Sequence, residues 1–299
     1  MGKASKSKQR LTTREKIAIQ RAAERRAQVR KRTLIALASV AVVVALVVAL
    51  VVIKLGTKSS PPSASGLPTG AKLSAIISNV TTVPVSTLAA VGKGTVLTPP
   101  SRLSNQRPLT QNGKPEIVYI GAEYCPYCAA ERWALVVALS RFGTFSNLGV
   151  THSDLHDVYA NTKTLTFYKS SYTSNYVVFS PVEETDPNKK PLQTPTAEQN
   201  ALVKRYDAPP YVSASSTGAI PFIDFGNQFL VSGASFSPQV LQGKSWTQIS
   251  AALADPANPI AKAVNGTANV LTADICKLTG KKPANVCSAA PIPSLSGGA

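Results

Sequence analysis

The longest apolar run of the chain is Leu34–Ile53, twenty residues in which nothing is more polar than Ser39. At about 1.5 Å of rise per helical residue, such a run reaches roughly 30 Å, the thickness of a bilayer's hydrocarbon core. We therefore predict a transmembrane helix over 33–53. A cleaved signal peptide is the alternative, because residues 63–65 (SAS) resemble a cleavage site, but this run and the segment before it are longer than such peptides use.

The hydrophobic pattern weakens after this run. Residues 54–72 are rich in Pro, Gly and Ser and have no hydrophobic period, which predicts a flexible linker. Residues 73–112 predict an N-terminal extension, with one or two short helical turns interrupted at Pro84 and then a loop that ends in a turn at Asn112-Gly113.

A clear change of pattern falls after residue 116. Four apolar, β-prone residues at 117–120 predict a strand buried on both faces. Nine apolar residues within 129–139 then predict a helix that Gly143 ends. Two cysteines, Cys125 and Cys128, lie at this junction between strand and helix.

Shorter elements follow in the rest of the chain. We expect strands at 164–168 and 175–180, an exposed segment at 181–199, a helix around 198–205, and a β-hairpin at 221–231 with its turn at Gly226-Asn227. Strands and helices together predict an α/β domain over 113–299.

Charge is concentrated at the N-terminus. The first 32 residues hold twelve Lys or Arg against two Glu, a net +10 of the chain's +17. By the positive-inside rule, we expect 1–32 to be a basic cytoplasmic tail and the C-terminal domain to be extracytoplasmic, in a single-pass protein of the cell membrane. Because no aromatic residue is interleaved with these charges, we expect the tail to meet anionic lipid headgroups and expect no nucleic acid as a partner.

The two cysteines of the junction have the spacing of a redox pair, although Cys-x-x-Cys also serves metal sites and structural disulfides. If Pro126 takes the first helical position, Cys125 becomes the helix cap. The free N–H groups and positive helix end then favour its thiolate, the attacking species. Cys128 lies one turn along, within the ~4.4 to 6.8 Å Cα separation of a disulfide, and can resolve a mixed disulfide.

The neighbours of this pair have more than one interpretation. Tyr124 and Tyr127 flank the sulfurs and offer apolar surface to a protein substrate, or else pack as ordinary aromatic residues. Glu123 and Glu131 oppose thiolate formation, whereas Arg132 supports it.

A zinc site is the alternative use of these cysteines. His152 and His156 are spaced i, i+4 and would share a helix face, which completes a Cys₂His₂ set on paper. The 23-residue gap after Cys128 and the lack of an apolar pattern around the histidines argue against it, so we expect surface histidines and no metal.

The other two cysteines, Cys276 and Cys287, lie in a hydrophilic stretch that we expect to be a loop. Outside the cytoplasm they are expected to form a disulfide, and closing a loop of this size contributes roughly 3 kcal/mol in the chain-entropy model. A second redox relay is the alternative, but no helix start follows either cysteine to activate it.

Taken together, the buried strand, the Cys-Pro-Tyr-Cys motif at the next helix and the hairpin opened by Ile220-Pro221 resemble the thioredoxin superfamily. In that family the proline bond is cis and lies beside the cysteines, which implies roles for Pro221 in the site and for Ile220 in substrate binding. The anchor and the long segment between the motifs resemble exported members such as DsbA-type oxidoreductases. The stretch 121–149 resembles a membrane-anchored thioredoxin-like family catalogued as domain of unknown function 929. The resemblance implies a thioredoxin-like fold with an inserted segment.

Two functions remain open at this point. One is a thiol-disulfide oxidoreductase that acts on cysteines of exported proteins, needs no cofactor, and is recycled by a redox partner in the membrane or envelope. The other is a non-catalytic binding or scaffold module of the cell envelope, in which Cys125 and Cys128 form a structural disulfide.

Overall fold

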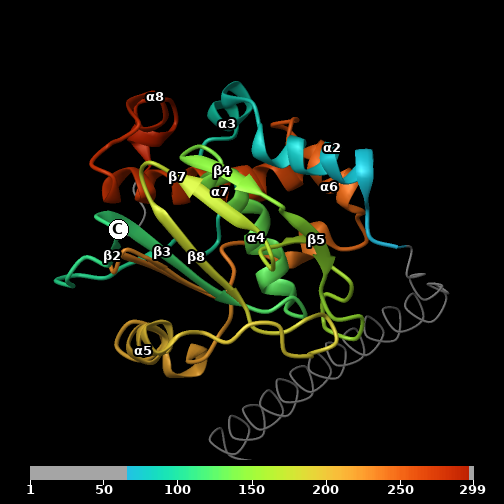
Figure 1. Ribbon diagram of the computed structural model, residues 1–299. Helices are drawn as coiled ribbons and strands as arrows, with labels where there is room; N and C mark the ends of the chain where they lie inside the picture. The colour runs from blue at the N-terminus through green and yellow to red at the C-terminus, as the bar shows by residue number, and fades with distance from the viewer. Residues whose placement is uncertain (1–65, 296–299) are drawn as a thin grey trace, which may run out of the picture. The chain divides into compact units, whose positions relative to one another are not determined.

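The computed structural model describes residues 66–295 (Figure 1). The predicted basic tail, the transmembrane helix and most of the linker lie outside these described residues. Within them, no single helix is long and apolar enough to cross a membrane; helices α2 (Gly70–Thr81) and α3 (Val85–Val91), bent by 57° at their junction, pass that test only as a pair.

The centre of the domain is a mixed sheet around strand β3 (Lys114–Gly121). On one side β3 pairs in parallel with β8 (Val178–Glu183), and on the other it pairs antiparallel with β9 (Phe222–Phe225). The sheet continues antiparallel through β10 (Phe229–Ser232) to the short β1 (Ser101–Arg102), while β2 (Thr110–Gln111) pairs with the start of β3.

Both faces of β3 are covered, as its unbroken apolar run predicts. Ile117 and Tyr119 belong to the larger hydrophobic core, which includes helices α4 (Pro126–Leu139) and α7 (Pro259–Leu278). Val118 and Ile120 belong to a smaller core that α5 (Ala197–Tyr206) covers from the opposite face (Figure 1). Alternate side chains of one strand therefore stabilise two separate layers.

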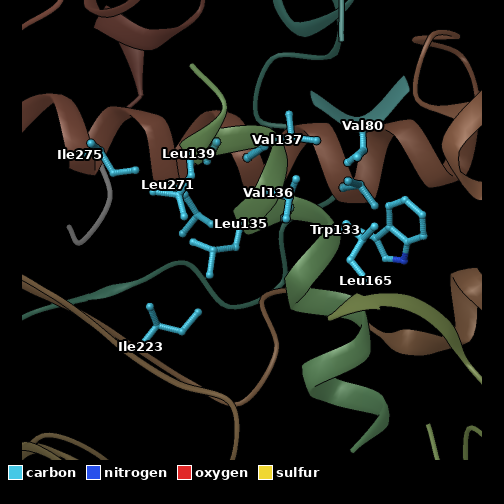
Figure 2. Close-up of a cluster of buried hydrophobic side chains, with 14 of the residues drawn as sticks. Val80, Trp133, Leu135, Val136, Val137, Leu139, Leu165, Ile223, Leu271 and Ile275 are labelled. Carbon is cyan, nitrogen blue, oxygen red and sulfur yellow. The ribbon is translucent and has the colours of Figure 1, made fainter. Parts of the chain in front are cut away.

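The packing of α4 on α7 forms the middle of the larger core. Every residue of α4 except Tyr127 is buried, as expected for a helix that, apart from Glu131 and Arg132, is apolar on all sides. Figure 2 shows the side chains at this contact and the neighbours that enclose them, with Leu135, Leu139, Leu271 and Ile275 between the helices, Trp133, Leu165 and Val80 at one end, and Ile223 from the sheet.

Helix α7 is the largest element that the sequence pattern did not predict. Its sequence, PIAKAVNGTANVLTADICKL, mixes small and polar residues, yet most of it is buried. Small side chains let neighbouring backbone approach closely. A Cβ atom on Gly266 would lie 2.5 Å from the carbonyl oxygen of Lys93, and one on Gly94 would lie 2.0 Å from that of Lys262.

The segment between α4 and β8 folds as two small antiparallel sheets. Strand β4 (Gly143–Ser146) pairs with β7 (Ser171–Ser174), and β5 (Gly149–His152) pairs with β6 (Lys163–Thr166). This segment is held against α4 by the Thr164 hydroxyl, which donates to the carbonyl of Ala129 at 2.7 Å.

Several predicted boundaries differ from the structure. Strand β8 continues to Glu183, into the segment expected to be exposed, because Val182 and Glu183 are buried in the sheet. Helix α2 begins at Gly70, before the expected end of the linker. The extension over 73–112 contributes α2, α3, β1 and β2 to the same compact unit as the rest of the domain. The predicted helix at 198–205 and the hairpin at 221–231 are confirmed as α5 and as β9 with β10.

Two further α-helices lie in the described part of the chain. Helix α6 (Trp246–Ala252) packs beside α2, and α8 (Ala284–Cys287) lies beyond the end of α7.

Candidate active site

Cys125 is the N-cap of α4, and Pro126 occupies the first helical position, as the sequence predicted. The Cys125 sulfur accepts a hydrogen bond from the backbone N–H of Cys128 at 3.2 Å. A side chain in this position receives one of the N–H groups that the first helical turn leaves free. Both sulfurs are thiols in the structure, with Cys125 5% exposed and Cys128 fully buried.

The two thiols have opposite acidities. The pKa of Cys125 is lowered, chiefly by a hydrogen bond from the Cys128 side chain, with further contributions from the Cys128 N–H and the charge of Arg132 that together outweigh burial. Burial raises the pKa of Cys128 well above its ordinary value, and its hydrogen bond to Cys125 adds to this. Cys125 is therefore the thiol of the pair that ionises first, and it is the more exposed of the two.

The loop before β9 reaches the same site. The Ile220–Pro221 peptide bond is cis, and the carbonyl of Ile220 lies 3.6 Å from the Cys125 sulfur. The structure therefore brings together Cys125, Cys128, Ile220 and Pro221, which are far apart in the sequence.

The two tyrosines differ in exposure. Tyr127 is 42% exposed and its ring meets that of Tyr159 edge-on at 5.9 Å. Tyr124 is half-buried, and the ammonium group of Lys189 lies 5.3 Å from the centre of its ring. Burial raises the pKa of Tyr124, and the negative charge of Cys125 adds to this.

The loop between β5 and β6 lies against this surface. The N–H of Asp154 donates to the carbonyl of Tyr124 at 2.8 Å. Leu155 and Val158 of the same loop are exposed, at 44% and 68%. These two exposed apolar residues are sequence neighbours of Asp154 and Tyr159, which contact Tyr124 and Tyr127.

Buried charge lies behind the cysteines, and the sequence did not indicate how it pairs. Arg132 and Glu183 form a fully buried ion pair with two hydrogen bonds of 2.6 and 2.7 Å. Burial alone would lower the pKa of Arg132, but the Glu183 carboxylate outweighs it and raises the pKa well above its usual range. Glu123 is also buried and accepts hydrogen bonds from the hydroxyls of Thr151 and Thr166.

The hydrogen-bond partner of Glu131 is Ser235. Its carboxylate accepts hydrogen bonds from the N–H and the hydroxyl of Ser235, at 2.8 and 3.0 Å. Burial raises the pKa of Glu131 to about 7. A signal for these buried charges was present in the sequence, since Glu131 and Arg132 interrupt an otherwise apolar helix.

The histidines do not share a helix face, so this premise of the zinc alternative is wrong. His152 ends strand β5, and His156 lies in the following turn. Across residues 66–295, no three His, Cys, Asp or Glu side chains are grouped in a way that could hold a metal ion.

Cys276 and Cys287 form a disulfide, with their Cα atoms 5.6 Å apart. The expected loop is wrong for both residues, because Cys276 lies in the last turns of α7 and Cys287 ends α8. The disulfide therefore links the short helix α8 to the C-terminal end of α7.

A comparison with protein families matches residues 100–277, more than half of the 299 residues. The chain belongs to the family described as Domain of unknown function (DUF929). The matched part of this DUF929 chain includes the cysteine pair, the Arg132–Glu183 ion pair and Pro221, and it ends one residue after Cys276. No curated protein and no solved structure matches the chain.

Proposed function

We propose that this protein is a membrane-anchored, extracytoplasmic thiol-disulfide oxidoreductase in which Cys125 attacks and Cys128 resolves. The observation that carries the proposal is the unequal pair of thiols at the start of α4. The pKa of Cys125 is lowered at the helix mouth, whereas the pKa of Cys128 is raised in the interior. This difference in acidity suits disulfide exchange, because one sulfur attacks the substrate as a thiolate while the other stays protonated until the mixed disulfide has formed.

The proposal includes a thioredoxin-like fold, and the topology supports it. Strand β3, helix α4 and the parallel strand β8 are followed by α5, the antiparallel hairpin β9 and β10, and helix α7. A sheet ordered β8-β3-β9-β10, with the cysteines directly after its central strand, is the arrangement expected of a thioredoxin-like core. The sheets β4/β7 and β5/β6 would then be the inserted segment.

The exchange itself is a sequence of two attacks. The Cys125 thiolate attacks one sulfur of a substrate disulfide, so that a mixed disulfide forms and the other substrate sulfur leaves as a thiolate. The Cys128 sulfur then attacks Cys125, releases the substrate and closes the Cys125–Cys128 bond. The substrate gains two electrons and two protons, and the pair is oxidised; run backwards, the same steps oxidise a substrate dithiol. A partner of the dithiol or disulfide class restores the pair.

The surface around Cys125 suits a polypeptide substrate. Tyr127, Leu155 and Val158 are three of the six exposed large hydrophobic residues of the described part of the chain. A concentration of apolar surface beside a reactive sulfur favours a segment of exported protein over a small polar thiol.

The location rests on the sequence alone. The apolar run Leu34–Ile53 and the basic residues before it support a single span with the domain outside the cytoplasm. Disulfides persist in that environment, which agrees with the Cys276–Cys287 bond.

The experiment that tests this function is the capture of a mixed disulfide. The full chain with Cys128→Ser should accumulate covalent adducts with exported proteins, because the adduct on Cys125 has lost its resolving thiol. The matched variant Cys125→Ser should capture few or none. Adducts are read on non-reducing gels and identified by mass spectrometry.

The opposite result would favour the scaffold function. If neither variant captures a partner, and the wild-type pair remains oxidised in buffers poised below about −300 mV, the bridge is structural and the protein is a binding module.

A further inference from the structure

A fully buried arginine lies behind the cysteine pair. Arg132 follows Cys128 by four residues on α4, so the two side chains share a face of the helix. Among the buried side chains of residues 66–295, Arg132 is the only Lys or Arg. Its Nη1 atom is buried and makes no hydrogen bond within the same residues. The guanidinium group thus retains one N–H-bearing nitrogen without a protein acceptor.

Two contacts fix the position of this charge. Its Nε and Nη2 atoms bind the Glu183 carboxylate, and Nη2 also donates to the carbonyl of Ala122 at 2.8 Å. The same carbonyl accepts a hydrogen bond from the backbone N–H of Cys125 at 3.2 Å. The Ala122 carbonyl therefore contacts both the guanidinium group and the backbone of the cysteine pair.

The surroundings of Cys128 otherwise disfavour negative charge. The thiol is fully buried, and Glu123 and Glu183 are buried carboxyl groups of the same cluster. The ring of Tyr119 lies 5.9 Å from the guanidinium carbon, and burial raises the pKa of its hydroxyl, which stays neutral. A sulfur that has to carry negative charge during exchange needs a nearby positive charge, and Arg132 supplies it.

We propose that Arg132 is a positioning residue for thiol-disulfide exchange, whose charge, held by Glu183 and the Ala122 carbonyl, stabilises the thiolates of Cys125 and Cys128. This inference rests on the proposed function. When Cys128 attacks the mixed disulfide, its proton passes to the departing substrate thiolate. The Cys125–Cys128 bond forms as the bond from Cys125 to the substrate sulfur breaks, and Arg132 is unchanged throughout.

The test removes the ion pair as a unit, because removing one partner leaves the other buried without compensation. In the reduced full chain, Arg132→Met/Glu183→Leu should be alkylated at Cys125 by iodoacetamide about tenfold more slowly at neutral pH. A tenfold fall in rate corresponds to the loss of about 1.4 kcal/mol of free energy that stabilises the thiolate. Rates are measured by mass spectrometry of the Cys125 peptide across a pH series, and folding is checked by circular dichroism.

Two matched variants separate charge from packing. Arg132→Lys keeps the positive charge and should restore most of the alkylation rate. Arg205→Met removes a charge from α5, on the opposite face of the sheet, and should leave the rate unchanged. A folded double variant with the wild-type rate and pH profile overturns the proposal.

If the double variant does not fold, Glu183→Gln decides the question. It keeps the charge of Arg132 without its counter-charge, so Cys125 should react faster than in the wild type, and an equal or slower rate overturns the proposal. Because alkylation needs no protein substrate, this result is independent of mixed-disulfide capture. Failure of capture with a slowed alkylation rate rejects the enzyme, whereas capture with an unchanged rate rejects the role of Arg132.

Discussion

The four cysteines of the chain form two pairs at opposite kinds of helix end. Cys125 caps the N-terminus of α4, with Cys128 in the first turn, and both are thiols. Cys276 lies near the C-terminus of α7 and Cys287 ends α8, and they are joined in a disulfide. The first pair lies beside free N–H groups at the positive end of a helix dipole. The second pair lies beside carbonyl groups at the negative end of one.

The difference teaches that the environment of a cysteine decides its chemistry. A thiolate is stabilised at the start of α4 by N–H groups and by Arg132, whereas the negative end of the helix dipole opposes one at the end of α7. The second pair instead closes a short stretch of chain, with a sequence separation of 11, and holds α8 in place. We therefore expect the first pair to matter for reactivity and the second for stability.

The largest expected effect is the loss of exchange in the full chain with Cys125→Ser. Without the attacking thiolate, reduction of a disulfide-linked reporter peptide should fall to the rate without protein. The double variant Cys276→Ser/Cys287→Ser is the control, and it should keep most of the wild-type rate under conditions where it remains folded. The assignment of the first pair to reactivity is contradicted if both variants lose exchange equally, or if Cys125→Ser remains active.

The next effect concerns stability. Cys276→Ser/Cys287→Ser should lose about 3 kcal/mol of unfolding free energy, because the cross-link no longer restricts the unfolded chain. The matched variant Cys125→Ala/Cys128→Ala, compared with the reduced wild type, should lose only about 1 kcal/mol, the cost typical of a small truncation. Urea unfolding under oxidising and reducing conditions measures both, and equal losses would contradict the assignment of the second pair as a staple.

The third effect, no larger than the second, is a difference in pH response between the two regions. Burial raises the pKa of Glu131 in α4 to about 7 from a reference of 4.5, so the folded state holds its proton more tightly than the unfolded state. The resulting stabilisation is complete below pH 4.5 and is lost as the pH rises through about 7. At about 1.4 kcal/mol for each unit of pKa difference between the folded and unfolded states, the loss of unfolding free energy is at most on the order of 3 kcal/mol.

Glu131→Gln should therefore reduce the fall in urea midpoint between pH 5 and pH 8. Burial raises the pKa of Asp224 to about 7 as well, so the slope should weaken and not vanish. The disulfide variant should shift the whole curve downward without changing its slope, because neither the bonded cysteines nor the serines titrate. An unchanged slope in Glu131→Gln would show that this carboxyl does not govern the pH response.

Local signals account for much of the fold and for half of the candidate site. The strand at 117–120, the capped helix after it, α5 and the hairpin with its Gly226-Asn227 turn are each encoded within a few neighbouring residues. The N-cap role of Cys125 is local for the same reason, because it depends on Pro126 and the helix that follows. Helix α7 escaped prediction because its burial comes from close backbone approach at Gly266, and small residues do not give a strong hydrophobic period.

The sequence by itself determined where the reactive cysteines lie, that a helix starts between them, and that most of the positive charge is concentrated before the apolar run. Tertiary structure alone decided which distant groups meet them. Arg132 and Glu183 are separated by 51 positions, and Ile220 reaches Cys125 across 95. Helix capping acts over a few bonds, so it can be read from neighbours in the sequence, whereas a buried ion pair depends on how the chain packs and on the water that packing excludes.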